Sequence, residues 1–133
     1  LVYATNHTMS YNVVFNNPGD YYEYNIDLIN DAGYLAVSGR YDEIAIKIDD
    51  DEPITIWNYR EMKDQFKDIF EFEAVETNNQ SSYYSIVANS SKNYNFKFKV
   101  KDDITEENLN LIKGKSLIIT HSITYYNDNY VAH

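Results

Sequence analysis

The sequence predicts an all-β protein: a two-sheet β-sandwich of the jelly-roll or immunoglobulin-like type, with one or two short helices. Apolar side chains recur at every second position in many short segments, which is the period of a strand with one buried face. Turn residues separate these segments. At 133 residues the chain fits one domain whose core is large enough to fold alone.

The turn Pro18-Gly19-Asp20 and the segment after it, residues 21–30, show this pattern best. One side of the segment is apolar and the other is polar, as expected for a half-buried strand. The apolar side holds Tyr22, Tyr24, Ile26 and Leu28, and the polar side holds Glu23, Asn25 and Asp27. Further strands are expected at residues 11–15, 34–37, 44–48, 70–74, 83–88, 94–100 and 117–126.

Two helical segments interrupt the strands. Residues 58–69 place Tyr59, Met62, Phe66 and Ile69 on one stripe at steps of three and four. A second, shorter helix is expected after Thr105, a good N-cap residue, and it ends before Gly114. Residues 89–93 are predicted to form a turn between two neighbouring strands.

Composition excludes several classes of partner. The formal charge of −10, from 21 acidic and 11 basic residues, argues against nucleic acid and against an anionic membrane surface. Cysteine is absent, so no disulfide framework, thiolate metal site or cysteine nucleophile is expected. No apolar run approaches the roughly 20 residues of a membrane helix. The chain begins at Leu1 rather than Met, which we interpret as a processed or trimmed N-terminus.

The N-terminal segment Leu1, Val2, Tyr3, Ala4 and Thr5 is apolar and β-prone, although it lies at a chain end. Asn6-His7-Thr8 is interpreted as a turn that separates it from the first core strand. The segment is either an edge strand on its own sheet, a disordered end, or a donor strand that completes the sheet of a neighbouring subunit. The corresponding domain division is a donor segment at residues 1–10 and a sandwich at residues 11–133.

Two blocks of sequence carry a family resemblance. Residues 15–24, with Phe15 and Pro18-Gly19-Asp20, followed by residues 27–30 and Gly33, resemble the first block of camelysin/TasA-like surface proteins. Residues 98–109, 115–119 and 123–125 look like the closing segment of the same family. Residues 40–93 between them do not map onto it.

This resemblance implies an exported, jelly-roll-like sandwich that serves as a fibre or biofilm-matrix subunit. It also implies a homopolymer in which each subunit donates its N-terminal strand, here residues 1–5, to the next. We therefore expect a secreted, cell-surface filament protein that binds itself. The alternative is a carbohydrate- or protein-binding sandwich domain of a cell-surface adhesin.

No enzyme site or cofactor is expected. His7, His121 and His133 lack the spacing of a zinc helix, and no nucleophile elbow or phosphate-binding loop occurs. His121 lies on the apolar side of its strand and is interpreted as a core or interface histidine. The peptidase activity linked to camelysin-type proteins therefore finds no support in these residues.

Carboxylates and asparagines give two further candidate sites. Calcium could bind the acidic turn, because clustered carboxylates supply hard oxygen ligands; its ligands would be Asp49, Asp50, Asp51 and Glu52. The alternative is a solvated charge run that ends a strand. N-glycosylation triplets begin at Asn6, Asn79 and Asn89, all in predicted turns, although such triplets also arise by chance in an Asn-rich chain.

Overall fold

The computed structural model describes residues 2–30, 37–52, 54–56, 66–76 and 90–128, and it confirms the all-β prediction. Helical structure in these ranges is short. The elements, in chain order, are β1 (Val2–Val13), β2 (Tyr21–Asn30), β3 (Val37–Ile48), β4 (Ile54–Ile56), β5 (Phe70–Glu76), β6 (Ser90–Val100), α1 (Glu106–Leu109) and β7 (Leu117–Asp128).

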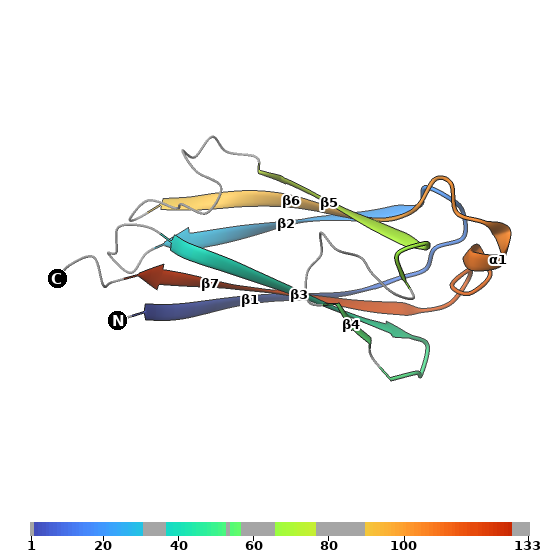
Figure 1. The fold of residues 1–133 in the computed structure, drawn as a ribbon, viewed down its shortest axis with the longest axis horizontal. Coiled ribbons are helices and arrows are strands. Elements are labelled where there is room, and N and C mark those ends of the chain that lie inside the picture. Colours follow the sequence, from blue (N-terminus) through green and yellow to red (C-terminus); the bar gives the residue numbers. More distant parts are fainter. Residues whose placement is uncertain (1, 31–36, 53, 57–65, 77–89, 129–133) are drawn as a thin grey trace.

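The strands form two antiparallel sheets that pack face to face (Figure 1). One sheet has the order β1-β7-β3-β4, and the other has the order β2-β6-β5. The first strand thus pairs with the last, and the second strand pairs with the last but one. This nested pairing is the wrapping of a jelly roll. It leaves β1 and β2 as edge strands of the two described sheets.

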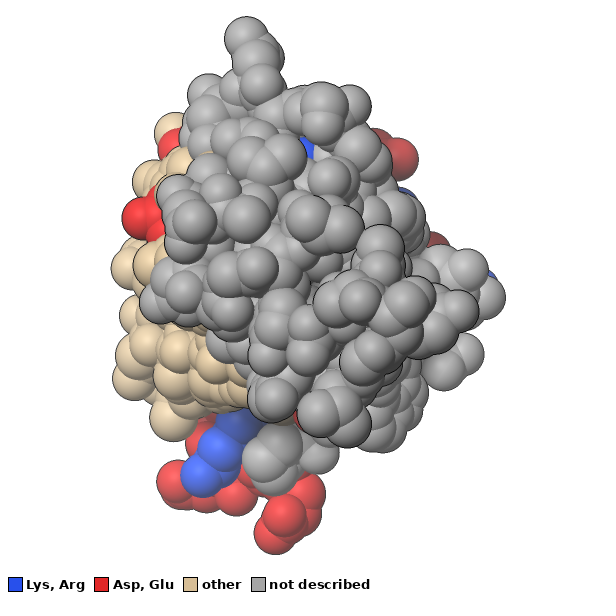
Figure 2. All heavy atoms as spheres, turned by 90° about the vertical axis from the view of Figure 1, so that its left-hand side faces the viewer, with Lys and Arg blue, Asp and Glu red and all other residues tan. Residues whose placement is uncertain are grey.

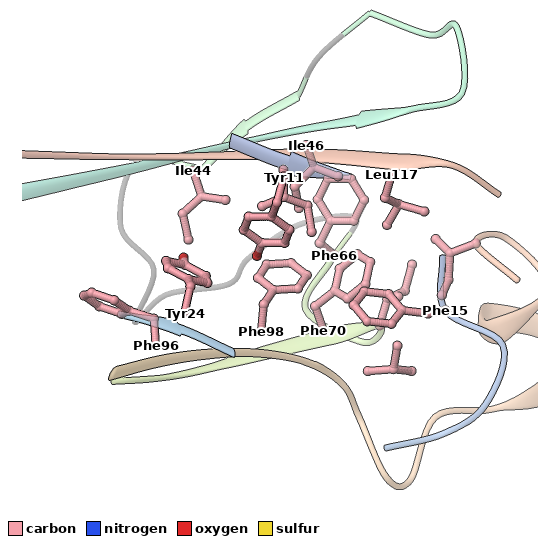
Figure 3. Close-up of a cluster of buried hydrophobic side chains, with 14 of the residues drawn as sticks. Tyr11, Phe15, Tyr24, Ile44, Ile46, Phe66, Phe70, Phe96, Phe98 and Leu117 are labelled. Carbon is pink, nitrogen blue, oxygen red and sulfur yellow. The ribbon is translucent and has the colours of Figure 1, made fainter. Parts of the chain in front are cut away.

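The core lies between the sheets because every second side chain of each strand points inward. Figure 3 shows this cluster, with aromatic rings of β6 and β2 facing aliphatic side chains of β3 and β7. Phe96, Phe98 and Leu117 are completely buried in it. Phe15, just after β1, closes one end of the core and stacks on Phe98, with ring centroids 6.4 Å apart. Each such ring contributes roughly 1.5–3 kcal/mol by leaving water.

The loop between β1 and β2 confirms the predicted turn. The Asp20 carboxylate accepts hydrogen bonds from the backbone N–H groups of Asn16 and Asn17, both at 2.9 Å. Gly19 adopts φ +83°, a left-handed conformation that favours glycine. At the same end of the sandwich, Thr105 caps α1 by accepting from the N–H of Asn108 at 3.2 Å, as predicted.

Some sequence-based boundaries are wrong. β1 runs without a break from Val2 to Val13, so the turn predicted at residues 6–8 is a strand, and the division after residue 10 coincides with no change of element. β6 begins at Ser90, so most of the turn predicted at residues 89–93 is also a strand. Asn93 is accommodated there because its side-chain amide donates to Asp27 of β2 at 2.8 Å.

Other predictions fall partly outside the described residues. Residues 58–65 of the helix predicted at 58–69, residues 34–36 of the strand predicted at 34–37, and the whole strand predicted at 83–88 lie outside them. The described end of the predicted helix, residues 66–69, forms a turn that buries Phe66 and Ile69 before β5 begins.

Candidate functional site

The two sheet edges β1 and β2 lie next to each other along one side of the sandwich, which we call the seam. Near the loop that joins these strands, the seam is closed by aromatic rings. Tyr11 of β1 stacks on Tyr22 of β2, with centroids 4.3 Å apart and planes 14° apart. Tyr11 also lies 5.1 Å from the ring of Tyr24. This contact fastens the second half of β1 to the opposite sheet.

Further toward the N-terminus the seam opens into a groove of about 280 Å³, the seam groove. Its lining is mixed, with three apolar side chains among polar ones that include an amide and a carboxylate. It is lined by His7, Thr8 and Met9 of β1 and by Asn25, Ile26, Asp27 and Ile29 of β2. A groove of this kind between two sheet edges can receive a side chain of an extended polypeptide that adds to either edge.

The predicted donor segment begins β1 itself. Val2–Thr5 pair with Asp128–Tyr125 of β7 in the same chain. A single chain therefore adopts the alternative arrangement, an edge strand on its own sheet. Donation of this segment to a second copy stays a prediction.

A polar pair lies inside the sandwich beneath the seam. The Tyr24 hydroxyl and His121 Nδ1 are 2.6 Å apart, and the two side chains are 4% and 0% exposed. Burial raises the pKa of Tyr24 well above its usual value of 10.0, and burial has the same effect on Tyr11. Tyr24 therefore keeps its proton, and it shares a hydrogen bond with Nδ1 in which the tautomer of His121 decides which atom donates.

The surroundings of His121 give it a structural role. The rings of Phe96 and Phe72 meet its ring edge to face, at 4.7 and 5.3 Å. A completely buried imidazole in such a box has no access to a substrate in solution. The interpretation of His121 as a core histidine is confirmed. His7 lines the seam groove, and His133 lies outside the described residues.

One carboxylate of the predicted calcium site, that of Asp49, is bonded to the backbone beside β7. Asp49 makes two reciprocal hydrogen bonds with Ser116: its N–H donates to the carbonyl at 2.7 Å, and its Oδ1 accepts from the N–H at 2.9 Å. Asp50, Asp51 and Glu52 are exposed. Acidic side chains gather at the lower end of the view in Figure 2, on the side where Figure 1 draws the turn after β3. Within the described ranges no group of three or more His, Asp or Glu could hold a metal ion, and calcium stays a prediction.

The predicted glycan acceptor Asn6 lies in β1, not in a turn. It accepts from the Thr8 hydroxyl at 2.7 Å and donates to the Thr124 hydroxyl of β7 at 2.9 Å. Asn79 and Asn89 lie outside the described residues. The exposed ring of Tyr21 has the Lys97 ammonium 4.0 Å from its centroid. Glycosylation and sugar binding stay predictions.

Sequence reasoning missed the seam groove and the Tyr11–Tyr22 stack. Both tyrosines lie on the apolar side of their segments, which indicated that they are buried but not that they contact each other. In the part of the chain that the structure describes, no helix is long and apolar enough to cross a membrane. No known protein family, curated protein or solved structure matches the chain.

Proposed function

We propose that the protein is a structural subunit of an extracellular filament or matrix fibre, in which copies join head to tail by exchanging residues 1–5. The resemblance of the two sequence blocks to camelysin/TasA-like proteins supports this class. The observation that carries the proposal is the position of Val2–Thr5 on a sheet edge, with β7 as their strand partner in the described sheet.

An element in that position can be exchanged with little change in free energy. When residues 2–5 of one copy replace the same residues on β7 of the next copy, the same ladder of hydrogen bonds forms again. Each copy gives its segment to one neighbour and receives a segment from another. Such a head-to-tail contact does not close on itself, so it builds an open fibre.

The packing of β1 favours exchange of its first half. From Tyr11 onward the strand is fastened by the ring stack with Tyr22. Over His7 and Met9, by contrast, it borders the seam groove, and both side chains are half-buried. Local opening concentrates where few apolar contacts hold a segment. The segment before Tyr11 can therefore leave β7 while the rest of the sandwich stays folded.

A pair of cysteines tests the exchange directly, because the chain has none of its own. Ala4 and Tyr126 are register partners on β1 and β7, so the variant Ala4→Cys/Tyr126→Cys can form a disulfide across this pair. Oxidising monomers first should lock the segment and abolish fibres seen by negative-stain microscopy. Oxidising assembled fibres should give a ladder of covalent multimers on a non-reducing gel.

Deletion of residues 1–5 gives the second measurement. The shortened chain should form no fibres and should bind a Leu-Val-Tyr-Ala-Thr peptide, whereas a scrambled peptide should not bind. Fibres that assemble normally from the locked or shortened chain would refute strand exchange. A covalent dimer without higher multimers would show a closed, reciprocal swap and would refute the fibre.

A further inference from the structure

The edges of the two described sheets differ in how well they are protected against pairing with another strand. Proteins blunt such edges with short strands, charges, prolines or bulges. β4 has three residues, and β5 and β2 carry acidic residues along their length. β1 has 12 residues without Asp, Glu, Lys, Arg or Pro, and its pairing with β7 shows no register shift. Among the four edges of the described sheets, β1 is therefore the one that lacks these protective features.

From Asn6 to Asn12 the outward side chains of β1 do not cover its main-chain edge, because each is bonded to β7 or to the residue just before it. Asn6 bonds Thr124, at 2.9 Å. The same holds for the next three outward positions, whose bonds are Thr8 to Ser122 at 3.2 Å, Ser10 to Thr120 at 3.1 Å and Asn12 to Ser116 at 2.9 Å. All of these polar groups therefore point toward β7 and away from the outer edge of β1.

We infer that the outer edge of β1 pairs with the outer edge of β1 in a second copy. The two strands run antiparallel about a twofold axis, so that the two four-stranded sheets become one continuous sheet. The charges of the chain decide which edge two copies can share. Two copies at −10 repel each other, and pairing along β2 or β5 would bring carboxylates together. A ladder of hydrogen bonds between the β1 strands of two copies would bring together no Asp, Glu, Lys or Arg side chains from either strand.

This inference goes beyond the proposed fibre. Strand exchange uses the side of β1 that faces β7, whereas edge pairing uses the opposite side of the same strand. In a fibre, the edge contact joins two neighbouring fibres side by side. In solution, it makes a dimer.

Single cysteines along β1 locate the contact. The variants Asn6→Cys, Thr8→Cys, Ser10→Cys and Asn12→Cys each place one thiol at an exposed position. In an antiparallel pair of identical strands, only positions near the twofold axis bring the two copies of one residue together. Mild oxidation should therefore give most dimer at one or two adjacent positions. Ser122→Cys, on the same face but one strand inward, is the matched control and should give little. Equal cross-linking at every position, or none above the control, would overturn the inference.

Charge reversal of the edge gives an independent measurement. The variant Thr8→Lys/Ser10→Lys should be a monomer by sedimentation, because like charges then face each other across the pair. The variant Thr120→Lys/Ser122→Lys carries the same charge one strand inward and should remain a dimer. A wild-type chain that stays monomeric at its highest soluble concentration would also refute edge pairing.

The two proposals fail separately. Loss of fibres on deletion of residues 1–5, with cross-linking retained at residues 8 or 10, supports both. Fibres that still form bundles in the Thr8→Lys/Ser10→Lys variant refute edge pairing and leave strand exchange standing.

Discussion

Replacing Tyr24 by phenylalanine removes one buried hydroxyl and keeps the ring in place. The hydroxyl is 2.6 Å from His121 Nδ1, and the histidine is completely buried. Tyr24→Phe therefore leaves the buried Nδ1 of His121 without this hydrogen-bond partner, which costs about 2 kcal/mol within a range of about 1–3. For a chain of 133 residues, that loss lowers the melting temperature by about 7 °C.

A double-mutant cycle separates the hydrogen bond from other effects of the substitution. His121→Leu alone should cost a similar amount, because the buried Tyr24 hydroxyl then loses its hydrogen-bond partner on His121. In Tyr24→Phe/His121→Leu both polar groups are gone, so the double variant should lose clearly less than the sum of the two singles, with a coupling of about 1 kcal/mol or more. Equilibrium unfolding in urea, followed by far-ultraviolet circular dichroism, measures all three values.

The exposed Tyr21 on the same strand provides the control. Tyr21→Phe should change the free energy of unfolding by less than about 0.5 kcal/mol. If Tyr24→Phe were equally mild, or if the double variant lost the full sum of the singles, the buried hydrogen bond would not be what holds His121 in the core.

Two further predictions concern pH and backbone conformation. Burial raises the pKa of Tyr11 and Tyr24 above the value of 10.0 that they have when unfolded. The folded chain thus keeps protons that the unfolded chain loses, so stability is intact below pH 10 and falls as the pH rises above it. A urea midpoint that does not change across pH 10 would contradict this. Gly19→Ala and Gly114→Ala should each lower the free energy of unfolding by about 1–2 kcal/mol in the same assay, because both glycines have positive φ, +83° and +71°. An added Cβ at Gly19 would lie 2.8 Å from a carboxylate oxygen of Asp102, but this exposed side chain can move aside. A much larger loss at Gly19 than at Gly114 would contradict this.

The alternation of apolar and polar residues predicted the strands well where charges mark the outer face. β2 has the predicted limits, Tyr21 and Asn30, because Glu23 and Asp27 fix which side faces water. The two-sheet sandwich and the cap of α1 at Thr105 followed from equally local signals.

The predicted strand boundaries were wrong where residue types that favour turns occur inside a strand. Asn6 and Thr8 favour turns in isolation, yet in β1 their side chains bond Thr124 and Ser122, which are more than 100 positions away in the sequence. Long-range pairing here overrides local propensity, as is common in sheets.

The seam groove could not be predicted for a related reason. It exists because β1 and β2 are the edges of two different sheets, and edge position depends on the whole strand order. The partner of His121 was also hidden, since Tyr24 lies 97 positions away. The sequence could place His121 on a buried face but could not indicate what it meets there.

The absence of charge from β1 is hard to explain for a chain that acts alone. A net charge of −10 keeps single chains apart, and glutamate or lysine at the exposed positions of β1 would protect its edge without disturbing the core. Instead, all four described outward positions before Val13 hold uncharged side chains that bond toward β7. The proposed strand exchange would use the side of the strand that faces β7, and the proposed edge pairing would use its outer side. A β1 without charged side chains suits both proposals, because it brings no like charges together between two copies.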